Sequence, residues 1–258
     1  PLLRQQLDVL VEKLARIPGI TDLALTTNGF LFPQKARALR DAGLRRVSFS
    51  LDSLDRDNFR KITGTDGLGS VLESIELALS LGLNPVKVNA VVIRGINDQE
   101  IENLADFARR KGIQFRFIEF MPLDSRRAWQ KDLVVSGREI MERLRARFAI
   151  QPVQSTHPSE TARRWAFADG PGEIGIIAPV SEPFCGHCNR LRLTADGKLR
   201  TCLFSQVEHD LRERVRNGES DEALKAFIRG VVLQKEARHH IGEPDFKQPE
   251  RTMSCIGG

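Results

Sequence analysis

Short runs rich in β-branched and aromatic residues alternate with amphipathic runs of helix length, and this alternation constrains the fold more than any other feature of the chain. Strands are expected at 22–26, 46–51, 86–93 and 114–120, and helices at 2–16, 34–41, 55–62, 71–81 and 98–111. Such alternation is typical of repeated βα units, whose strands form a parallel sheet, either open or closed into a barrel. We therefore predict an α/β fold.

The alternation stops after residue 123, and the elements expected beyond it are shorter. A helix is expected at 136–148 and strands at 162–168 and 173–177, with Gly170-Pro171-Gly172 as the turn between the two strands. We therefore predict two parts, residues 1–123 with the βα units and residues 124–258 as a smaller C-terminal α+β portion.

The predicted strands carry polar residues where a buried parallel strand is usually apolar throughout. Serines alternate with apolar residues in 46–51, and Lys87 and Asn89 do so in 86–93. A half-exposed antiparallel strand shows the same alternation, but in βα units polar side chains near the C-terminal strand ends usually line a binding site. The candidates at or just beyond such positions are Thr26, Ser50, Lys87, Arg116 and Met121.

Three cysteines indicate a metal centre in the C-terminal portion. Cys185 and Cys188 form a CxxC pair, and Cys202 follows after a turn that contains glycine. Three thiolates so close in sequence can gather around one centre at little entropic cost. Zinc would need a fourth ligand, which Cys255 or His187 could supply, whereas an iron–sulfur cluster with three protein ligands leaves one iron open. Spacing alone leaves both open.

Composition narrows the classes of protein that fit. The 258 residues are 41% hydrophobic and 28% charged, which is ordinary for a globular domain. The net charge of +5 suits an anionic ligand, but the chain has no tyrosine and its basic residues are scattered, so a nucleic-acid-binding stripe is not expected. No apolar run is long enough to span a membrane. Four cysteines and no leader-like segment favour the reducing cytoplasm over disulfide formation.

Taken together, the motifs closely resemble the MoaA family of radical S-adenosylmethionine enzymes over the whole chain. The matching segments are Leu25-Thr26-Thr27-Asn28-Gly29, Arg46-Val47-Ser48-Phe49-Ser50-Leu51-Asp52, Gly95-Ile96-Asn97-Asp98, Arg116-Phe117-Ile118-Glu119-Phe120-Met121, the three cysteines with Arg190 and Arg192, and the terminal Gly257-Gly258. The resemblance implies GTP 3',8-cyclase activity, an early reaction of molybdenum cofactor biosynthesis. It also implies an incomplete (β/α) barrel and a C-terminal extension that carries a [4Fe-4S] cluster.

The resemblance further implies a role for each matching residue. Cys185, Cys188 and Cys202 would hold the C-terminal [4Fe-4S] cluster, whose open iron binds the guanine of GTP. The residues matched to GTP binding are Thr26, Lys87, Arg116, Arg190, Leu191 and Arg192. Ser50 and Met121 match positions that contact S-adenosylmethionine, and Gly257 and Gly258 match a tail that reaches the active site. The implied partners are an external reductant and MoaC, the next enzyme of the pathway; a homodimer is possible.

One motif of the family does not occur in these residues. The CxxxCxxC that holds the S-adenosylmethionine-cleaving cluster matches no spacing among the four cysteines, and Pro1 resembles the proline of a Gly-Gly-Glu-Pro segment. We therefore expect the chain to be a fragment that lacks the first strands of the barrel. As given it would not cleave S-adenosylmethionine, and the second [4Fe-4S] cluster is expected only in the full-length protein.

Two alternatives differ from this interpretation in class. In the first, the four cysteines hold zinc in a structural module without catalytic activity. In the second, the chain is a radical S-adenosylmethionine relative whose auxiliary cluster serves another substrate. Iron and zinc content separates the zinc module from the cluster protein, while Arg190-Leu191-Arg192 and the double glycine favour the GTP enzyme over the relative.

Overall fold

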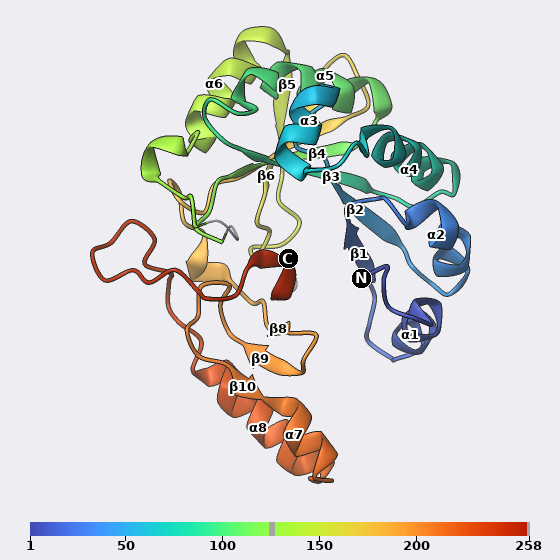
Figure 1. The fold of residues 1–258 in the computed structure, drawn as a ribbon, viewed down its shortest axis with the longest axis vertical. Helices are drawn as coiled ribbons and strands as arrows, with labels where there is room; N and C mark the ends of the chain where they lie inside the picture. Colours follow the sequence, from blue (N-terminus) through green and yellow to red (C-terminus); the bar gives the residue numbers. More distant parts are fainter. Residues whose placement is uncertain (124–126, 257–258) are drawn as a thin grey trace. The chain divides into compact units, whose positions relative to one another are not determined.

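A seven-stranded, mostly parallel sheet organises most of the chain in the computed structural model, which describes residues 1–123 and 127–256 (Figure 1). The strands follow the order β1-β2-β3-β4-β7-β6-β5. Their bounds are Ala24–Thr27 (β1), Arg46–Ser50 (β2), Val86–Val92 (β3), Gln114–Glu119 (β4), Ile150–Val153 (β5), Arg163–Phe167 (β6) and Glu173–Ile177 (β7). The first five strands of that order run parallel, and β6 and β5 extend the sheet antiparallel.

Among the described residues, five helices accompany the large sheet within the predicted alternation and a sixth lies beyond it. They are α1 (Leu7–Ala15), α2 (Phe32–Asp41), α3 (Arg56–Thr63), α4 (Leu68–Ser80), α5 (Ile101–Lys111) and α6 (Gly137–Arg147). The predicted α/β class with a mainly parallel sheet is confirmed, and β1 to β4 lie within two residues of the expected strands. The helix expected from residue 2 begins at Leu7 instead, because Gln6 has a left-handed backbone (φ 50°) that a helix does not continue through.

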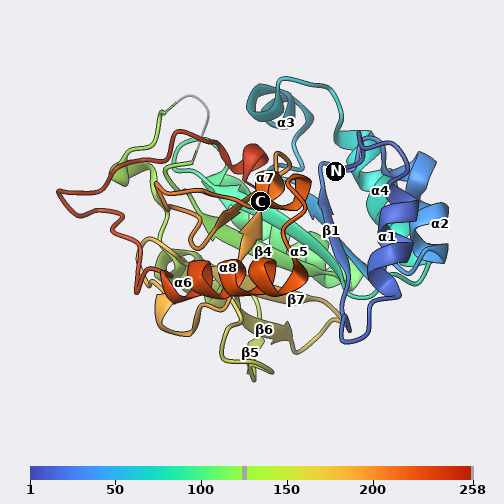
Figure 2. The ribbon, with the colours of Figure 1, turned by 90° about the horizontal axis from the view of Figure 1, so that it is seen from below.

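The two faces of the sheet differ in character because successive side chains of a strand point to opposite sides. One face carries buried apolar side chains, such as Val47, Phe49, Val88 and Phe115, and the helices pack on it (Figures 1 and 2). The other face, which we call the polar face, carries the alternating hydrophilic residues of β1 to β4. The apolar core thus fixes the register that presents the polar side chains together.

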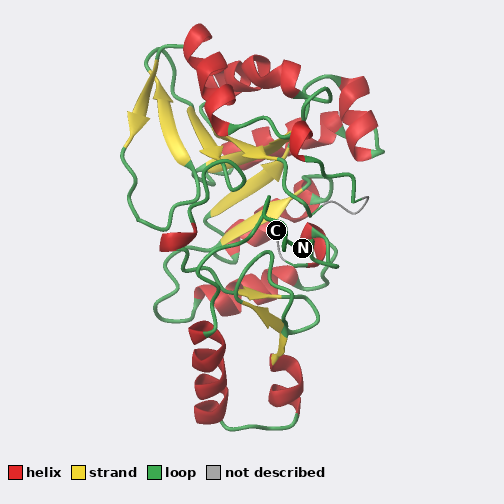
Figure 3. Cartoon of the chain, turned by 90° about the vertical axis from the view of Figure 1, so that its left-hand side faces the viewer, coloured by secondary structure: helices red, strands yellow, loops and turns green. Residues whose placement is uncertain are grey.

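The structure divides into two compact units, and each is a self-contained body. The first comprises residues 1–119, 135–156 and 162–177, and the second comprises residues 120–134, 157–161 and 178–258. Within the second unit, β8 (Arg192–Leu193), β9 (Lys198–Arg200) and β10 (His209–Asp210) form a small antiparallel sheet, followed by α7 (Leu211–Arg216) and α8 (Asp221–Leu233). Figure 3 shows α7 and α8 as neighbouring helices joined by a short loop.

The units do not follow the single division at residue 123 that we expected from the loss of alternation. α6 and β5 to β7 belong to the first unit because β7 pairs parallel with β4 and so continues the large sheet. No pattern in the residues indicated this pairing, since the segment between β4 and β7 is not a single crossover helix. None of the described helices is long and apolar enough to cross a membrane.

Candidate functional site

Four of the residues proposed from sequence lie on the polar face of the large sheet. Backbone register aligns Thr26 with Ser48, Ser48 with Lys87, and Asn89 with both Ser50 and Arg116. Because residues aligned in a parallel sheet point to the same side, the side chains of Thr26, Ser50, Lys87 and Arg116 share one surface. The first unit therefore brings together hydroxyl, amide and cationic groups suited to a polar anionic ligand.

Lys87 is a perturbed cation on this face. Burial, together with the positive charges of Arg116 and Arg46, lowers the pKa of its ammonium to about 8. Arg46 itself is paired with Asp22, at 2.8 Å between Nε and Oδ1. Lys87 makes no hydrogen bond or ion pair with the described residues, so its ammonium is available to an incoming anion.

Gly175 makes room for the side chain of Arg116. The two residues align in the pairing of β4 with β7, and a Cβ on Gly175 would lie 3.1 Å from Cγ of Arg116 and 3.2 Å from Cβ of Ala162. Such contacts are tighter than side chains normally adopt, so the missing Cβ lets the arginine stem lie across β7. This glycine was not singled out from the sequence, because its strand seemed to lie outside the parallel sheet.

The turn after β1 fixes the end of that strand next to Thr26. The hydroxyl of Thr27 accepts a hydrogen bond from the Gly29 amide (3.1 Å), and Ser74 of α4 donates to the Gly29 carbonyl (2.7 Å). Gly29 has a φ of 81°, a left-handed conformation that glycine adopts without strain. The Thr-Thr-Asn-Gly motif thus has a structural role as well as a candidate binding role.

Asp52 is a half-buried residue just beyond β2 to which the sequence analysis assigned no role. Burial raises its pKa to about 6, although a hydrogen bond from the Val91 amide (2.8 Å) opposes this rise. Asn97 donates to the carbonyls of Asp52 (2.8 Å) and Val91 (2.9 Å). These contacts tie the segment after Ser50 to β3 and hold the strand ends in place.

The cysteine trio (Cys185, Cys188 and Cys202) lies in the second unit. Cys185 to His187 form a single 3-10 turn in which the Cys188 amide donates to the Cys185 carbonyl (3.0 Å). Cys202 follows β9, and its sulfur accepts a hydrogen bond from the Phe204 amide (3.5 Å). All three thiols are unbridged and their residues are half-buried, as ligands at a partly enclosed centre should be.

Arg190 faces the sulfur of Cys188. Its guanidinium donates to Cys188 Sγ at 3.0 Å and lies over the Phe184 ring, 5.2 Å from the centroid. Burial of Cys188 opposes ionisation, but the hydrogen bonds and charge of Arg190 lower the thiol pKa overall. Burial raises the pKa of Cys202, and the Phe204 amide only partly offsets the rise. The thiolate form that metal binding requires is therefore favoured first at Cys188.

Arg192 and Leu191 follow in the same loop. Arg192 begins β8 and is half-buried, and burial together with the charge of Arg190 lowers its pKa. Leu191 between them is exposed. Two guanidinium groups at 190 and 192 thus accompany the cysteine trio, which suits a ligand with negative charge.

Two kinds of metal centre remain open for the cysteine trio. A structural zinc needs four ligands, whereas an iron–sulfur cluster with three protein ligands leaves one iron open. Cys255, the fourth cysteine, is exposed and its sulfur accepts a hydrogen bond from the Thr252 hydroxyl (3.7 Å).

Comparison with known proteins identifies the family. Residues 1–108 match the model described as Radical SAM superfamily, and residues 113–241 match Molybdenum Cofactor Synthesis C. A GTP 3',8-cyclase from Rhodopirellula baltica is 46% identical over 261 residues, covering 100% of this chain and 73% of the relative. The chain belongs to the GTP 3',8-cyclase family. The GTP 3',8-cyclase of Syntrophomonas wolfei (42% identical, 79% of its length covered) and GTP 3',8-cyclase 2 of Mycobacterium tuberculosis (43%, 73%) also match the entire chain.

Membership of the GTP 3',8-cyclase family confirms the resemblance drawn from the motifs, while the roles of individual residues remain predictions. Gly257 and Gly258, matched to the active-site tail, lie outside the described residues. The segment before them is anchored, because Arg251 donates to both carboxylate oxygens of Asp196 (3.0 and 2.8 Å) and pairs with Glu208 (2.9 Å). Sequence reasoning missed this anchor, since no local pattern links residues 55 positions apart.

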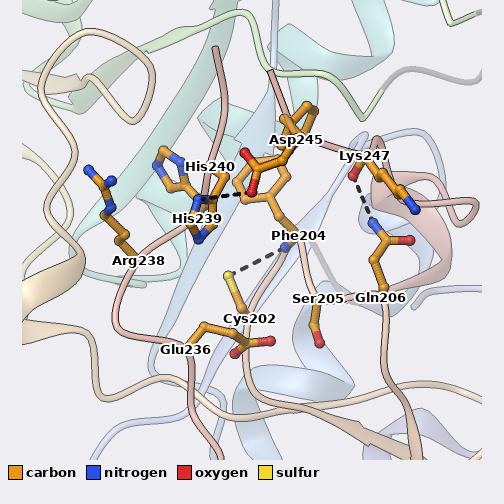
Figure 4. A pocket seen from close by; sticks show the side chains of 11 residues that line it. Cys202, Phe204, Ser205, Gln206, Glu236, Arg238, His239, His240, Asp245 and Lys247 are labelled. Atoms are coloured by element: carbon orange, nitrogen blue, oxygen red, sulfur yellow. Dashed lines mark hydrogen bonds and ion pairs between the residues drawn. The ribbon is translucent and has the colours of Figure 1, made fainter. Parts of the chain in front are cut away.

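A pocket of about 220 Å³ next to Cys202 is a second feature of this family member that the sequence did not reveal (Figure 4). Its lining includes Phe204, Glu236 and His239. The ring of Phe204 packs edge-on against His239, with centroids 5.2 Å apart. The side chains around Cys202 therefore come largely from the segment after α8, which carried no recognisable motif.

Proposed function

We propose that this protein acts as a GTP 3',8-cyclase, a radical S-adenosylmethionine lyase that converts GTP to (8S)-3',8-cyclo-7,8-dihydroguanosine 5'-triphosphate. This is the first step of molybdenum cofactor biosynthesis. The observation that carries the proposal is the 46% identity to a GTP 3',8-cyclase along the entire chain. The polar face and the cysteine trio supply groups suited to the nucleotide and to a cluster.

The cysteine trio is our proposed site for a [4Fe-4S] cluster, which would supply an open iron as a Lewis acid for the guanine ring. Arg190 favours the thiolate form of Cys188 by donating to its sulfur. Arg190 and Arg192, with the backbone of Leu191, would orient the nucleotide beside the trio. These roles follow the family match and the chemistry of the donors.

The polar face of the large sheet is our proposed site for the remaining contacts. Lys87 and Arg116 provide cations for the triphosphate, and Thr26 adds a hydroxyl donor. Half-buried cations hold phosphate more strongly than exposed ones because water screens them less. Ser50, at the end of β2, and Met121, just after β4, are proposed to contact S-adenosylmethionine.

Several finer features belong to the same proposal. The large sheet would be part of an incomplete (β/α) barrel, and the cluster-bearing extension would lie in the C-terminal portion predicted at residues 124–258. Four unbridged cysteines suit the reducing cytoplasm, where a reductant supplies electrons and an enzyme of the MoaC type takes the product onward. A homodimer is also proposed.

Anaerobic reconstitution with iron and sulfide tests the cluster and its ligands. We expect about four irons per chain and a spectrum that changes when GTP is added. Cys202→Ser should lose most of the iron, whereas the matched control Cys255→Ser should retain it. A colourless protein with one zinc that both substitutions remove would instead establish the zinc module. Iron without any spectral response to GTP would contradict nucleotide binding at the trio.

A further inference from the structure

Lys235 connects the two chain segments that carry the cysteine trio. It lies two residues beyond the end of α8, in the second unit, and its backbone amide donates to the Val232 carbonyl (3.1 Å). Its ammonium donates to the carbonyl of Arg190 (2.9 Å) and to the carbonyl of Thr201. Arg190 is two residues after Cys188, and Thr201 directly precedes Cys202. A single charged group therefore bridges the CxxC loop and the third cysteine.

Glu236 also holds Thr201, in this case through the threonine side chain. Its carboxylate accepts a hydrogen bond from the Thr201 hydroxyl at 2.6 Å. Burial would raise the pKa of Glu236, but the bonds from Thr201 and Ser205 keep it below its usual range. Thr201 is buried and is thus fixed through its carbonyl by Lys235 and through its hydroxyl by Glu236. Figure 4 shows Glu236 beside Cys202 at the pocket wall.

Lys235 and Glu236 place opposite charges at the same point of the chain. The ammonium of Lys235 donates to the Thr201 carbonyl and the carboxylate of Glu236 accepts from the Thr201 hydroxyl, and Thr201 directly precedes Cys202. Both charges would therefore act, with opposite sign, on an anionic cluster held by the trio, because net charge nearby is one of the determinants of cluster reduction potential.

We propose that Lys235 is a positioning residue for the cysteine trio, which holds the two cysteine segments at cluster spacing and, opposed by Glu236, sets the reduction potential of the bound cluster. The inference rests on the proposed function, in which the trio binds a [4Fe-4S] cluster. No family motif indicates this role for Lys235. Its ammonium donates to two backbone carbonyls, which lie 11 residues apart in sequence. Lys235 is not proposed as a ligand; it would act by holding the two segments and by placing a positive charge beside them.

The test uses the reconstituted chain with Lys235→Met, Lys235→Arg and Glu236→Gln. The matched control is Lys225→Met, which removes an exposed lysine of α8 that pairs with Glu222 (3.2 Å) on the same helix. Iron release to a chelator should be about tenfold faster in Lys235→Met, the usual order of loss when an outer partner of metal ligands is removed. Lys235→Arg should restore slow release, and the control should match the wild type.

The reduction potential separates this role from a merely structural one. Removing the positive charge in Lys235→Met should shift the potential downward, and removing the negative charge in Glu236→Gln should shift it upward. Thermal melting of the iron-free proteins shows whether Lys235→Met folds; if it does not, the opposite shift in Glu236→Gln and the behaviour of Lys235→Arg carry the test. Wild-type potential and iron release in Lys235→Met would overturn the proposal. A wild-type chain that binds no iron would instead overturn the proposed function.

Discussion

Lys87, on the polar face, lowers the stability of the fold and is also a candidate for ligand binding. Burial lowers the pKa of Lys87 to about 8, so the folded protein binds this proton less tightly than the unfolded chain does. The charged amine therefore lowers the unfolding free energy, fully below pH 8, and this penalty disappears as the pH rises from about 8 to the pKa of lysine in the unfolded chain. Lys87→Met should therefore raise the unfolding free energy at pH 7 by about 1 kcal/mol, less than the full shift implies because solvent screens the half-buried amine.

The same substitution should weaken GTP binding by about tenfold, the loss expected when a charge-assisted contact worth about 1.5 kcal/mol disappears. Wild-type affinity should decline as pH rises past about 8, and Lys87→Met should lack this decline. Titration calorimetry across pH 6.5 to 9.5, roughly the range in which this amine titrates, provides the measurement. The control is Lys61→Met on the exposed surface of α3. Equal GTP affinities of Lys87→Met and Lys61→Met would show that Lys87 does not contact the nucleotide.

Asp52 allows a second test at the scale of the residue. Its pKa is raised from 3.8 to about 6, so the contribution of this group to stability is greatest below pH 4 and is lost as pH rises through 6. Asp52→Asn retains an oxygen that accepts from the Val91 amide but carries no charge. It should stabilise the fold by about 1 to 3 kcal/mol at pH 7 and much less at pH 4. Urea unfolding at both pH values measures this, and an equal effect at both would exclude a buried charged carboxylate.

At the scale of the element, α3 depends on one carboxylate from a neighbouring element. Glu100 is buried and accepts hydrogen bonds from Ser53 Oγ (2.6 Å), the Leu54 amide (2.8 Å) and Asn58 Nδ2 (2.7 Å). Glu100→Ala removes all three bonds and leaves the Leu54 amide without its partner, while Ser53 Oγ and Asn58 Nδ2 keep the carbonyls of Asp55 (3.1 Å) and Ile96 (2.9 Å). The substitution should cost about 3 kcal/mol. Amide exchange should accelerate most in α3. The exposed neighbour Gln99→Ala serves as control, and unchanged protection of α3 in Glu100→Ala would refute its dependence on this carboxylate.

Sequence patterns predicted the elements whose burial is local and periodic. Lys87 and Asn89 alternate with buried valines, so β3 and its polar face could be predicted from the sequence. The pairing of β7 with β4 could not, because it depends on backbone hydrogen bonds between segments about 60 residues apart. The contacts around the cysteine trio could not be predicted either, because they too join segments that are distant in sequence. Lys235 donates to backbone carbonyls, and no side-chain pattern records which carbonyl a lysine will reach.

At the scale of the whole molecule, the chemistry of the 258 residues is limited by their four cysteines. Cys185, Cys188 and Cys202 are the proposed ligands of one cluster, and the spacing of the four cysteines matches no CxxxCxxC. With S-adenosylmethionine and a strong reductant, the reconstituted chain should therefore bind about four irons and yet release no 5'-deoxyadenosine.

S-adenosylmethionine cleavage can be tested separately from nucleotide binding, because its product is measured directly. Liquid chromatography with mass spectrometry detects 5'-deoxyadenosine, and a GTP 3',8-cyclase that contains the CxxxCxxC motif provides the positive control. The triple variant Cys185→Ser, Cys188→Ser, Cys202→Ser should lose the iron and leave the nucleoside signal at background. Release of 5'-deoxyadenosine by the wild-type chain but not by the triple variant would show that the trio itself cleaves S-adenosylmethionine, and the assignment of the trio to substrate binding would then fail.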